Sequence, residues 1–145
     1  MIDIYYITLD EAIKIHRETI KHSGGGAIGY INLEILDSVL THIQNDTYYP
    51  TFVDKITHLF FSTCQFHCFE DGNKRIAITL SAQLLLKNGY LSVAQSFLKE
   101  MENISYHVAA GKINKDLLRE IIDSILKGQF ESDESLKLKI YNAIS

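Results

Sequence analysis

The sequence predicts an all-α fold, a single bundle of six to seven helices with at most a small β-hairpin added to it. Two observations lead to this class. Apolar residues recur at i, i+3 and i+4 along most of the chain, which is the period of a helix with one buried face. Capping residues precede most of these stretches and glycine follows several of them, as expected at helix ends.

The N-terminal part of the chain predicts two helices. Residues 4–7 form a β-branched and aromatic run that is typical of a short strand. Thr8 and Glu11 have the spacing of a capping box, which starts a helix that ends before the glycines at 24–29. Those glycines satisfy G-x-G-x-x-G, but they follow a helix and not a strand, so we interpret them as a connector. Asn32 caps the second helix.

The middle of the chain predicts two apolar helices joined by a polar loop. Residues 44–50 interrupt the helical pattern with turn-forming residues. Thr51 then caps a helix that runs to about His67, and the next helix extends from about Asn73 to Asn88. Apolar residues surround this next helix almost completely, so we expect it to be deeply buried.

Three further helices are predicted in the rest of the chain. The first covers 92–110, and the second lies between Asn114, its cap, and Gly128, its stop. The last is short and contains the apolar positions from Leu136 to Ile144.

The whole chain, residues 1–145, is expected to form one domain. A hydrophobic content of 46% is enough for a single core, and we find no repeat or low-complexity tract. The core of this domain covers about 3–127, and an extra helical segment covers about 131–145.

Charge and cysteine content restrict the partners and the setting. The net charge of -4 argues against broad electrostatic binding to nucleic acid or to an anionic membrane. No stretch suits a membrane span, and the first residues do not resemble a signal peptide. Cys64, Cys68 and His67 would offer zinc only three ligands at poor spacing. We interpret the cysteines as structural thiols in a reducing cytoplasm.

The polar loop between the two apolar helices ends in a predicted anion site. Gly72 is followed by Asn73, Lys74 and Arg75 at the start of a helix. The first N–H groups of a helix have no partner within it, and the helix dipole favours negative charge there. Arg75 can bind phosphate oxygens with two parallel hydrogen bonds, and Lys74 adds a mobile positive charge.

Two further residues of the loop suggest transfer chemistry on a nucleotide. Asp71 could hold Mg²⁺ against the same phosphates, since Mg²⁺ prefers one or two carboxylates plus phosphate oxygens. His67 is suited to take a proton near neutral pH. Asp71 could also serve only as a helix cap, and His67 could be a buried histidine bonded to a carbonyl.

Residues 67–75 resemble the signature of the Fic/Doc family, and their Gly-Asn-Lys-Arg ending resembles the death-on-curing (Doc) branch of that family. The match is His67-x-Phe69-x-Asp71-Gly72-Asn73-Lys74-Arg75. Similar residues continue outside the motif, and the resemblance covers roughly residues 3–127. They are Ile7-Thr8-Leu9, Ile15-His16, Gly24-Gly25-Gly26, Tyr49-Pro50-Thr51 and Ala110-Gly111-Lys112-Ile113.

The resemblance implies a transferase that uses ATP and Mg²⁺. His67 would deprotonate an incoming hydroxyl, and Asn73 and Arg75 would hold the phosphates. Lys74 stands where most nucleotide-transferring members have Gly, and Ile78 stands where they have a second Arg. For Doc-like proteins these two differences imply that ATP binds in the reversed orientation. The terminal phosphoryl group of ATP would then be transferred to a Ser or Thr hydroxyl of a host protein, such as a translation factor.

Two alternatives remain open. Some Doc proteins have Ala where this chain retains Gly72, so adenylyl (AMP) transfer to a protein hydroxyl is the first alternative. The second is a Fic-like binding module without catalysis.

The resemblance also implies partners of a toxin–antitoxin system. Residues 44–50 would be a flap that pairs with the protein substrate, although an ordinary connector containing Tyr48 and Tyr49 is the alternative. The pattern Ser96 to Glu100 is followed by Met101 and does not complete a self-inhibitory helix. A separate antitoxin protein is therefore expected to restrain the enzyme, unless residues 131–145 act as a built-in cover.

Overall fold

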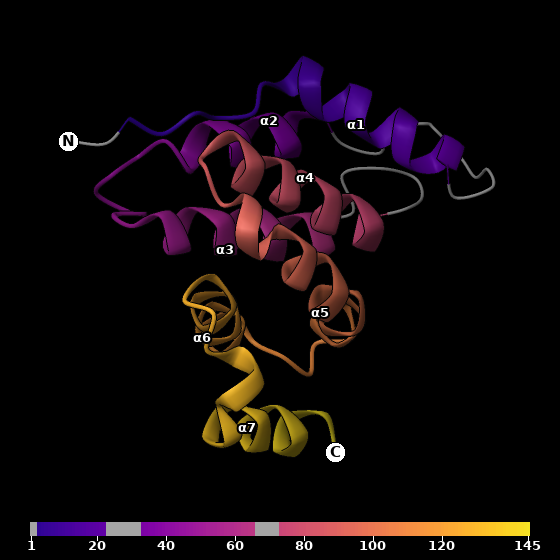
Figure 1. Ribbon diagram of the computed structural model, residues 1–145. Coiled ribbons are helices and arrows are strands. Elements are labelled where there is room, and N and C mark those ends of the chain that lie inside the picture. Colours follow the sequence, from indigo (N-terminus) through magenta and orange to yellow (C-terminus); the bar gives the residue numbers. More distant parts are fainter. Residues whose placement is uncertain (1–2, 23–32, 66–72) are drawn as a thin grey trace.

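The computed structural model describes residues 3–22, 33–65 and 73–145. These residues form seven α-helices and one short 3-10 helix, and none of them forms a strand, so the predicted all-α class is confirmed (Figure 1). The elements are α1 Leu9–His22, α2 Leu33–His42, α3 Phe52–Gln65, α4 Asn73–Lys87, α5 Leu91–Ala109, α6 Lys115–Leu126, η1 Phe130–Ser132 and α7 Glu134–Ile144.

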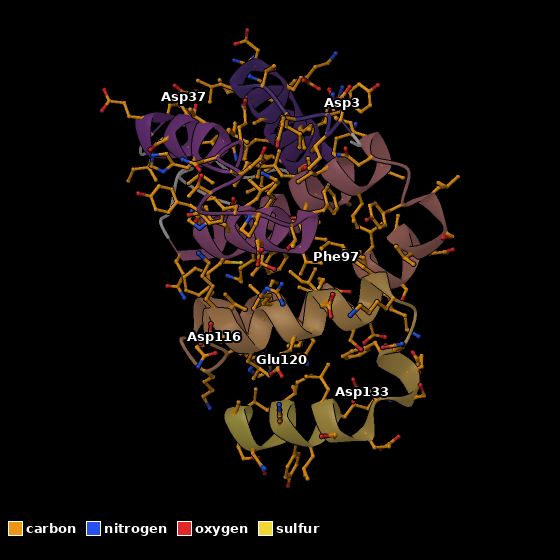
Figure 2. All side chains as sticks on the ribbon, turned by 90° about the vertical axis from the view of Figure 1, so that its left-hand side faces the viewer. Asp3, Asp37, Phe97, Asp116, Glu120 and Asp133 are labelled. Carbon is orange, nitrogen blue, oxygen red and sulfur yellow. The ribbon has the colours of Figure 1, made fainter. Side chains whose placement is uncertain are left out.

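Helices α3 and α4 form the centre of the bundle. α4 packs against α1, α3 and α5, and α3 also packs against α2 and α6. Ile76 and Leu84 of α4 are completely buried, as the apolar pattern of this helix predicted. Phe97 of α5 lies in the interior (Figure 2), and its ring makes a T-shaped contact with the ring of Phe60, with the two ring centroids 6.2 Å apart. The core therefore fixes both helices that flank the polar loop.

Side-chain caps determine where several helices begin. In the first capping box, the N–H of Glu11 donates to the Thr8 hydroxyl and the N–H of Thr8 donates to the Glu11 carboxylate, both at 3.2 Å. Thr51 and Asp54 make the same exchange at the start of α3, at 3.1 Å in each direction. Asn114 accepts from the N–H of Leu117 at 2.8 Å at the start of α6. The predicted starts of these three helices are confirmed.

The predicted strand at 4–7 is not present. Asn88, just after α4, makes two hydrogen bonds with the backbone of Tyr5: its Oδ1 accepts from the Tyr5 N–H and its Nδ2 donates to the Tyr5 carbonyl, both at 2.9 Å. The extended segment thus finds its backbone partners in a side chain and not in a second strand.

The expected β-hairpin is also absent at 44–50. The side-chain oxygen of Asn45 accepts from the N–H groups of Thr47 and Tyr48 at 2.9 and 3.1 Å. The backbone carbonyl of Asn45 accepts from the N–H of Tyr49 at 2.9 Å. These local bonds close a turn, because Asn readily binds backbone groups two or three residues ahead.

The C-terminal helix α7 packs on α6 through its buried residues Leu136 and Ile140. Lys139 adds an ion pair of 2.9 Å to Glu120 of α6. Figure 1 shows α6 lying between α7 and the α3–α4 layer. Helix α7 therefore does not cover the first turn of α4. In the part of the chain that the structure describes, no helix has the length and apolarity to cross a membrane.

Candidate functional site

Helix α1 runs antiparallel to α4, and this places its C-terminal end beside the first turns of α4. Lys87 near the end of α4 forms an ion pair of 2.9 Å with Glu11 near the start of α1. Further along, the hydroxyls of Thr19 and Thr79 are 3.2 Å apart. The end of α3 lies at the same end of the bundle, because α3 and α4 pack together and are connected by residues 66–72 alone.

The first turn of α4 brings together three of the predicted site residues. Asn73 is partly exposed, and Lys74 and Arg75 are exposed. No acidic residue lies in this turn, while Ile76 and Ala77 directly behind it are completely buried and anchor the helix. Two cations thus stand at a fixed helix N-terminus, where backbone N–H groups and the dipole favour an anion. His67, Asp71 and Gly72, which were also predicted for the site, lie outside the described residues.

The last turn of α3 is firmly held. The side chain of Gln65 donates to the carbonyl of Val108, at the end of α5, at 2.6 Å. Cys64 beside it is a buried free thiol, and burial raises its pKa to about 12, although the nearby charge of Lys74 acts in the opposite direction. Such a thiol is protonated and unreactive at neutral pH, which agrees with the structural role predicted for Cys64.

Ile78 packs against the hydrophobic core and is partly buried. The sequence position at which a second arginine would hold a nucleotide therefore contributes to the core. No group of three or more His, Cys, Asp or Glu side chains suited to a metal occurs within residues 3–22, 33–65 and 73–145.

A largely apolar cleft of about 820 Å³ lies between α1, α4 and α5. Ile15, Thr79, Ala82, Leu86 and Leu98 contribute to its wall. It opens along the side of α4 and not at the first turn. Apolar walls offer an anion no compensation for lost water, so this cleft is a poorer candidate for phosphate than the N-terminus of α4.

The predicted flap lies at the wrong end of α3. Tyr48 and Tyr49 precede Phe52, the first residue of α3, whereas the polar loop follows Gln65, the last. A helix rises about 1.5 Å per residue, so roughly 20 Å separates these two ends. Residues 44–50 are a connector, as in the alternative interpretation, and not a flap beside the anion site.

Tyr49 belongs to a polar cluster that the sequence did not reveal. Its ring stacks on His58 of α3 at a centroid distance of 4.6 Å. The Nζ atom of Lys115, the first residue of α6, lies 2.7 Å from His58 Nδ1. These residues are far apart in sequence and no local pattern joins them, so only the packing of α6 on α3 brings them together.

A family model described as the Fic/DOC family matches residues 6–85, which include α1, α2, α3, the polar loop and most of α4. No curated protein matches the chain.

Proposed function

The chain belongs to the Fic/DOC family, and from this premise we propose that it transfers the terminal phosphoryl group of ATP to a Ser or Thr hydroxyl of another protein. One observation carries the proposal: Asn73, Lys74 and Arg75 form the first turn of α4, and both cations are exposed there. An anion bound at this turn would meet the N-terminal backbone N–H groups of the helix and a favourable dipole.

The residues of the motif have different roles in binding ATP and Mg²⁺. Asn73 and Arg75 hold phosphate oxygens, and Lys74 adds charge from the neighbouring position. Asp71 would hold Mg²⁺, in keeping with the preference of this ion for one or two carboxylates together with phosphate oxygens. The exposed cations at a helix N-terminus suit a triphosphate, so the described part of the site fits the cofactor.

His67 acts as the general base. It takes the proton of the incoming hydroxyl, and the hydroxyl oxygen then attacks the terminal phosphorus of ATP. The bond between this phosphorus and ADP breaks, and ADP leaves. Bound ATP supplies the phosphoryl group, with Mg²⁺ neutralising part of its charge. The contribution of the protein is mainly to position the groups and stabilise charge, as is usual for phosphoryl transfer.

Ile78 supports phosphoryl transfer over adenylyl transfer. Its side chain packs against the core, so it contributes no cation to the nucleotide. Lys74 supplies a charge one turn closer to the start of α4 than Ile78, since residues four apart lie on the same face of a helix in successive turns. A reversed ATP, with its terminal phosphate presented to the hydroxyl, agrees with this distribution of charge.

Labelled ATP tests the reaction. The purified chain is incubated with Mg²⁺ and a bacterial extract, with ATP labelled at either the γ or the α phosphate. We expect γ-label on a protein and loss of labelling in His67→Ala and Arg75→Gln, with Lys112→Met as the active control. Transfer of α-label would establish the adenylyl alternative. Absence of both labels, with wild-type chain folded, would favour a binding module.

We further propose that the chain is a toxin of a toxin–antitoxin system, acting in the cytoplasm and restrained by a separate antitoxin protein. The position of α7 against α6 supports an external restraint, because this helix leaves the first turn of α4 uncovered. A translation factor is the first protein substrate to examine. Expression of the chain alone in bacteria should stop growth, and His67→Ala should restore it. Equal growth with both chains would contradict the toxin proposal.

A further inference from the structure

A half-buried lysine lies in the polar cluster between α3 and α6. Lys115 Nζ lies 2.7 Å from Nδ1 of His58, 5.5 Å from the centre of the Tyr49 ring and 6.0 Å from that of Phe61. The amine is therefore held in one place by an imidazole and two aromatic faces. This arrangement is separate from the first turn of α4 and does not depend on the proposed transferase activity.

The partner of the amine is a neutral group. Burial, together with the charges of Lys115 and His42, lowers the pKa of His58 from 6.5 to about 4, so the imidazole is uncharged at neutral pH. Among the described residues, no carboxylate lies within 4.0 Å of Lys115 Nζ. A neutral acceptor stabilises an ammonium less than a carboxylate does.

The surrounding charges do not restore the ordinary basicity of the amine. Burial lowers the pKa of Lys115, although Asp54 of α3 and Asp116 of α6 act in the opposite direction. Asp116 is exposed and lies at the outer end of α6 (Figure 2). Asp54 is already bound to Arg119, at 2.6 Å from its Nε. A larger fraction of Lys115 is therefore uncharged, and hence nucleophilic, than for an exposed lysine.

A cavity of about 260 Å³ gives small molecules access to this amine. Its wall includes Lys115, Arg119, Thr57, Tyr48 and Tyr49, together with two carboxylates, Asp116 and the Asp54 that is paired with Arg119. The guanidinium of Arg119 has N–H donors besides the one bound to Asp54. The hydroxyl of Thr57 is buried and has no hydrogen-bond partner. The cavity thus combines a nucleophile with a donor for an acidic group.

We propose that Lys115 is a reactive amine that forms an imine with a small aldehyde or ketone carrying a carboxylate or phosphate. The ammonium first loses a proton to solvent, and the nitrogen attacks the carbonyl carbon. One hydrogen then moves from the nitrogen to the former carbonyl oxygen, a proton from solvent adds to the same oxygen, and the C–O bond breaks to release water. The product is a protonated imine, and no oxidant or reductant takes part. Arg119 binds the acidic group, and His58 acts as a positioning residue.

Pyridoxal 5′-phosphate is a suitable probe, because it carries an aldehyde and a phosphate. The folded chain is treated with less than one equivalent, reduced with borohydride, digested and mapped by mass spectrometry. We expect the peptide containing Lys115 to carry most of the label. Lys115→Met and Lys115→Arg should lose this label, whereas the matched control Lys112→Met, three residues away and exposed, should retain it.

Two further comparisons separate a built site from general lysine reactivity. Pyridoxal without its phosphate should label Lys115 less, and Arg119→Gln should remove this difference between the two probes. His58→Gln, which keeps an acceptor, should shift the pH at which labelling is half-maximal, whereas a purely structural role would leave it unchanged. The proposal fails if the label is spread evenly over the exposed lysines, or if both substitutions of Lys115 leave the labelling pattern unaltered in folded protein.

Discussion

Lys55 offers the sharpest test of what holds this fold together. Its side chain is only 1% exposed, although it lies in the first turn of α3. The Nζ atom donates to the carbonyl of Ile43 at 2.8 Å and to the carboxylate of Asp46 at 2.7 Å, and it lies 5.6 Å from the centre of the Tyr6 ring. One cation therefore ties the connector after α2 and the N-terminal segment to α3.

The two hydrogen bonds should contribute unequally. A bond from a charged donor to a buried carbonyl stabilises by about 1.5–3 kcal/mol, and its loss leaves the Ile43 carbonyl without this donor. Asp46 is 83% exposed, so solvent screens its ion pair and we expect less than about 1 kcal/mol from it. Lys55→Met keeps the aliphatic stem and should lower the free energy of unfolding by about 2–3 kcal/mol, whereas Asp46→Asn should lower it by less than about 1 kcal/mol.

Urea denaturation at neutral pH measures both variants, and a thermal scan should show a decrease of roughly 4–10 °C for Lys55→Met. Burial acts to lower the pKa of Lys55, but hydrogen bonds to Asp46 and Tyr6 outweigh it and leave the pKa above 10.5. The stabilisation is therefore present below pH 10.5 and disappears as the pH rises through the higher value in the folded chain. An Asp46→Asn variant that is as unstable as Lys55→Met, or a Lys55→Met variant as stable as wild type, would refute this reasoning.

Three other changes have defined outcomes. Asn88→Ala removes two hydrogen bonds to Tyr5 and should cost about 1–2 kcal/mol, with faster amide exchange at Tyr5 as its specific signature. Asn114→Ala removes the cap of α6 and should cost about 1 kcal/mol in urea denaturation, while Asn114→Asp should retain most of the stability. The pKa of His58 is lowered to about 4 in the folded chain, so its contribution to stability is full above pH 6.5 and is lost as the pH falls towards 4. In His58→Gln the free energy of unfolding should change less between pH 4 and pH 6.5 than in the wild type. An unchanged pH dependence would contradict the lowered pKa of His58.

Local signals in the sequence predicted most of the helix boundaries. The capping residues Thr8, Thr51 and Asn114 act within three residues of their own positions, so their partners are visible in the sequence. The same holds for Asn73 to Arg75, whose role as a helix start follows from the change from polar loop to apolar helix. Physical forces that act over a few residues can be recognised without a structure.

Contacts between distant parts of the chain could not be predicted in this way. Residues 4–7 have the composition of a strand, but their partner is the side chain of Asn88, 83 residues from Tyr5. Lys55 has a charge typical of an exposed position, yet it is buried because carbonyl and carboxylate oxygens from the preceding connector surround its amine. The pairing of Lys115 with His58 likewise depends on how α6 lies across α3. Periodicity indicates which face of a helix is buried but not which groups meet there.

The attachment of Tyr5 to Asn88 constrains the order in which a growing polypeptide can acquire its shape. Helix α1 rests on α4, and Asn88, just beyond the end of that helix, binds the backbone of Tyr5 in the segment that leads into α1. Synthesis proceeds at about 5–20 residues per second, so several seconds pass between the translation of α1 and that of α4, the helix on which α1 packs. Ribosome-bound chains arrested before Asn88 should therefore leave α1 open to protease, whereas chains released beyond it should protect it.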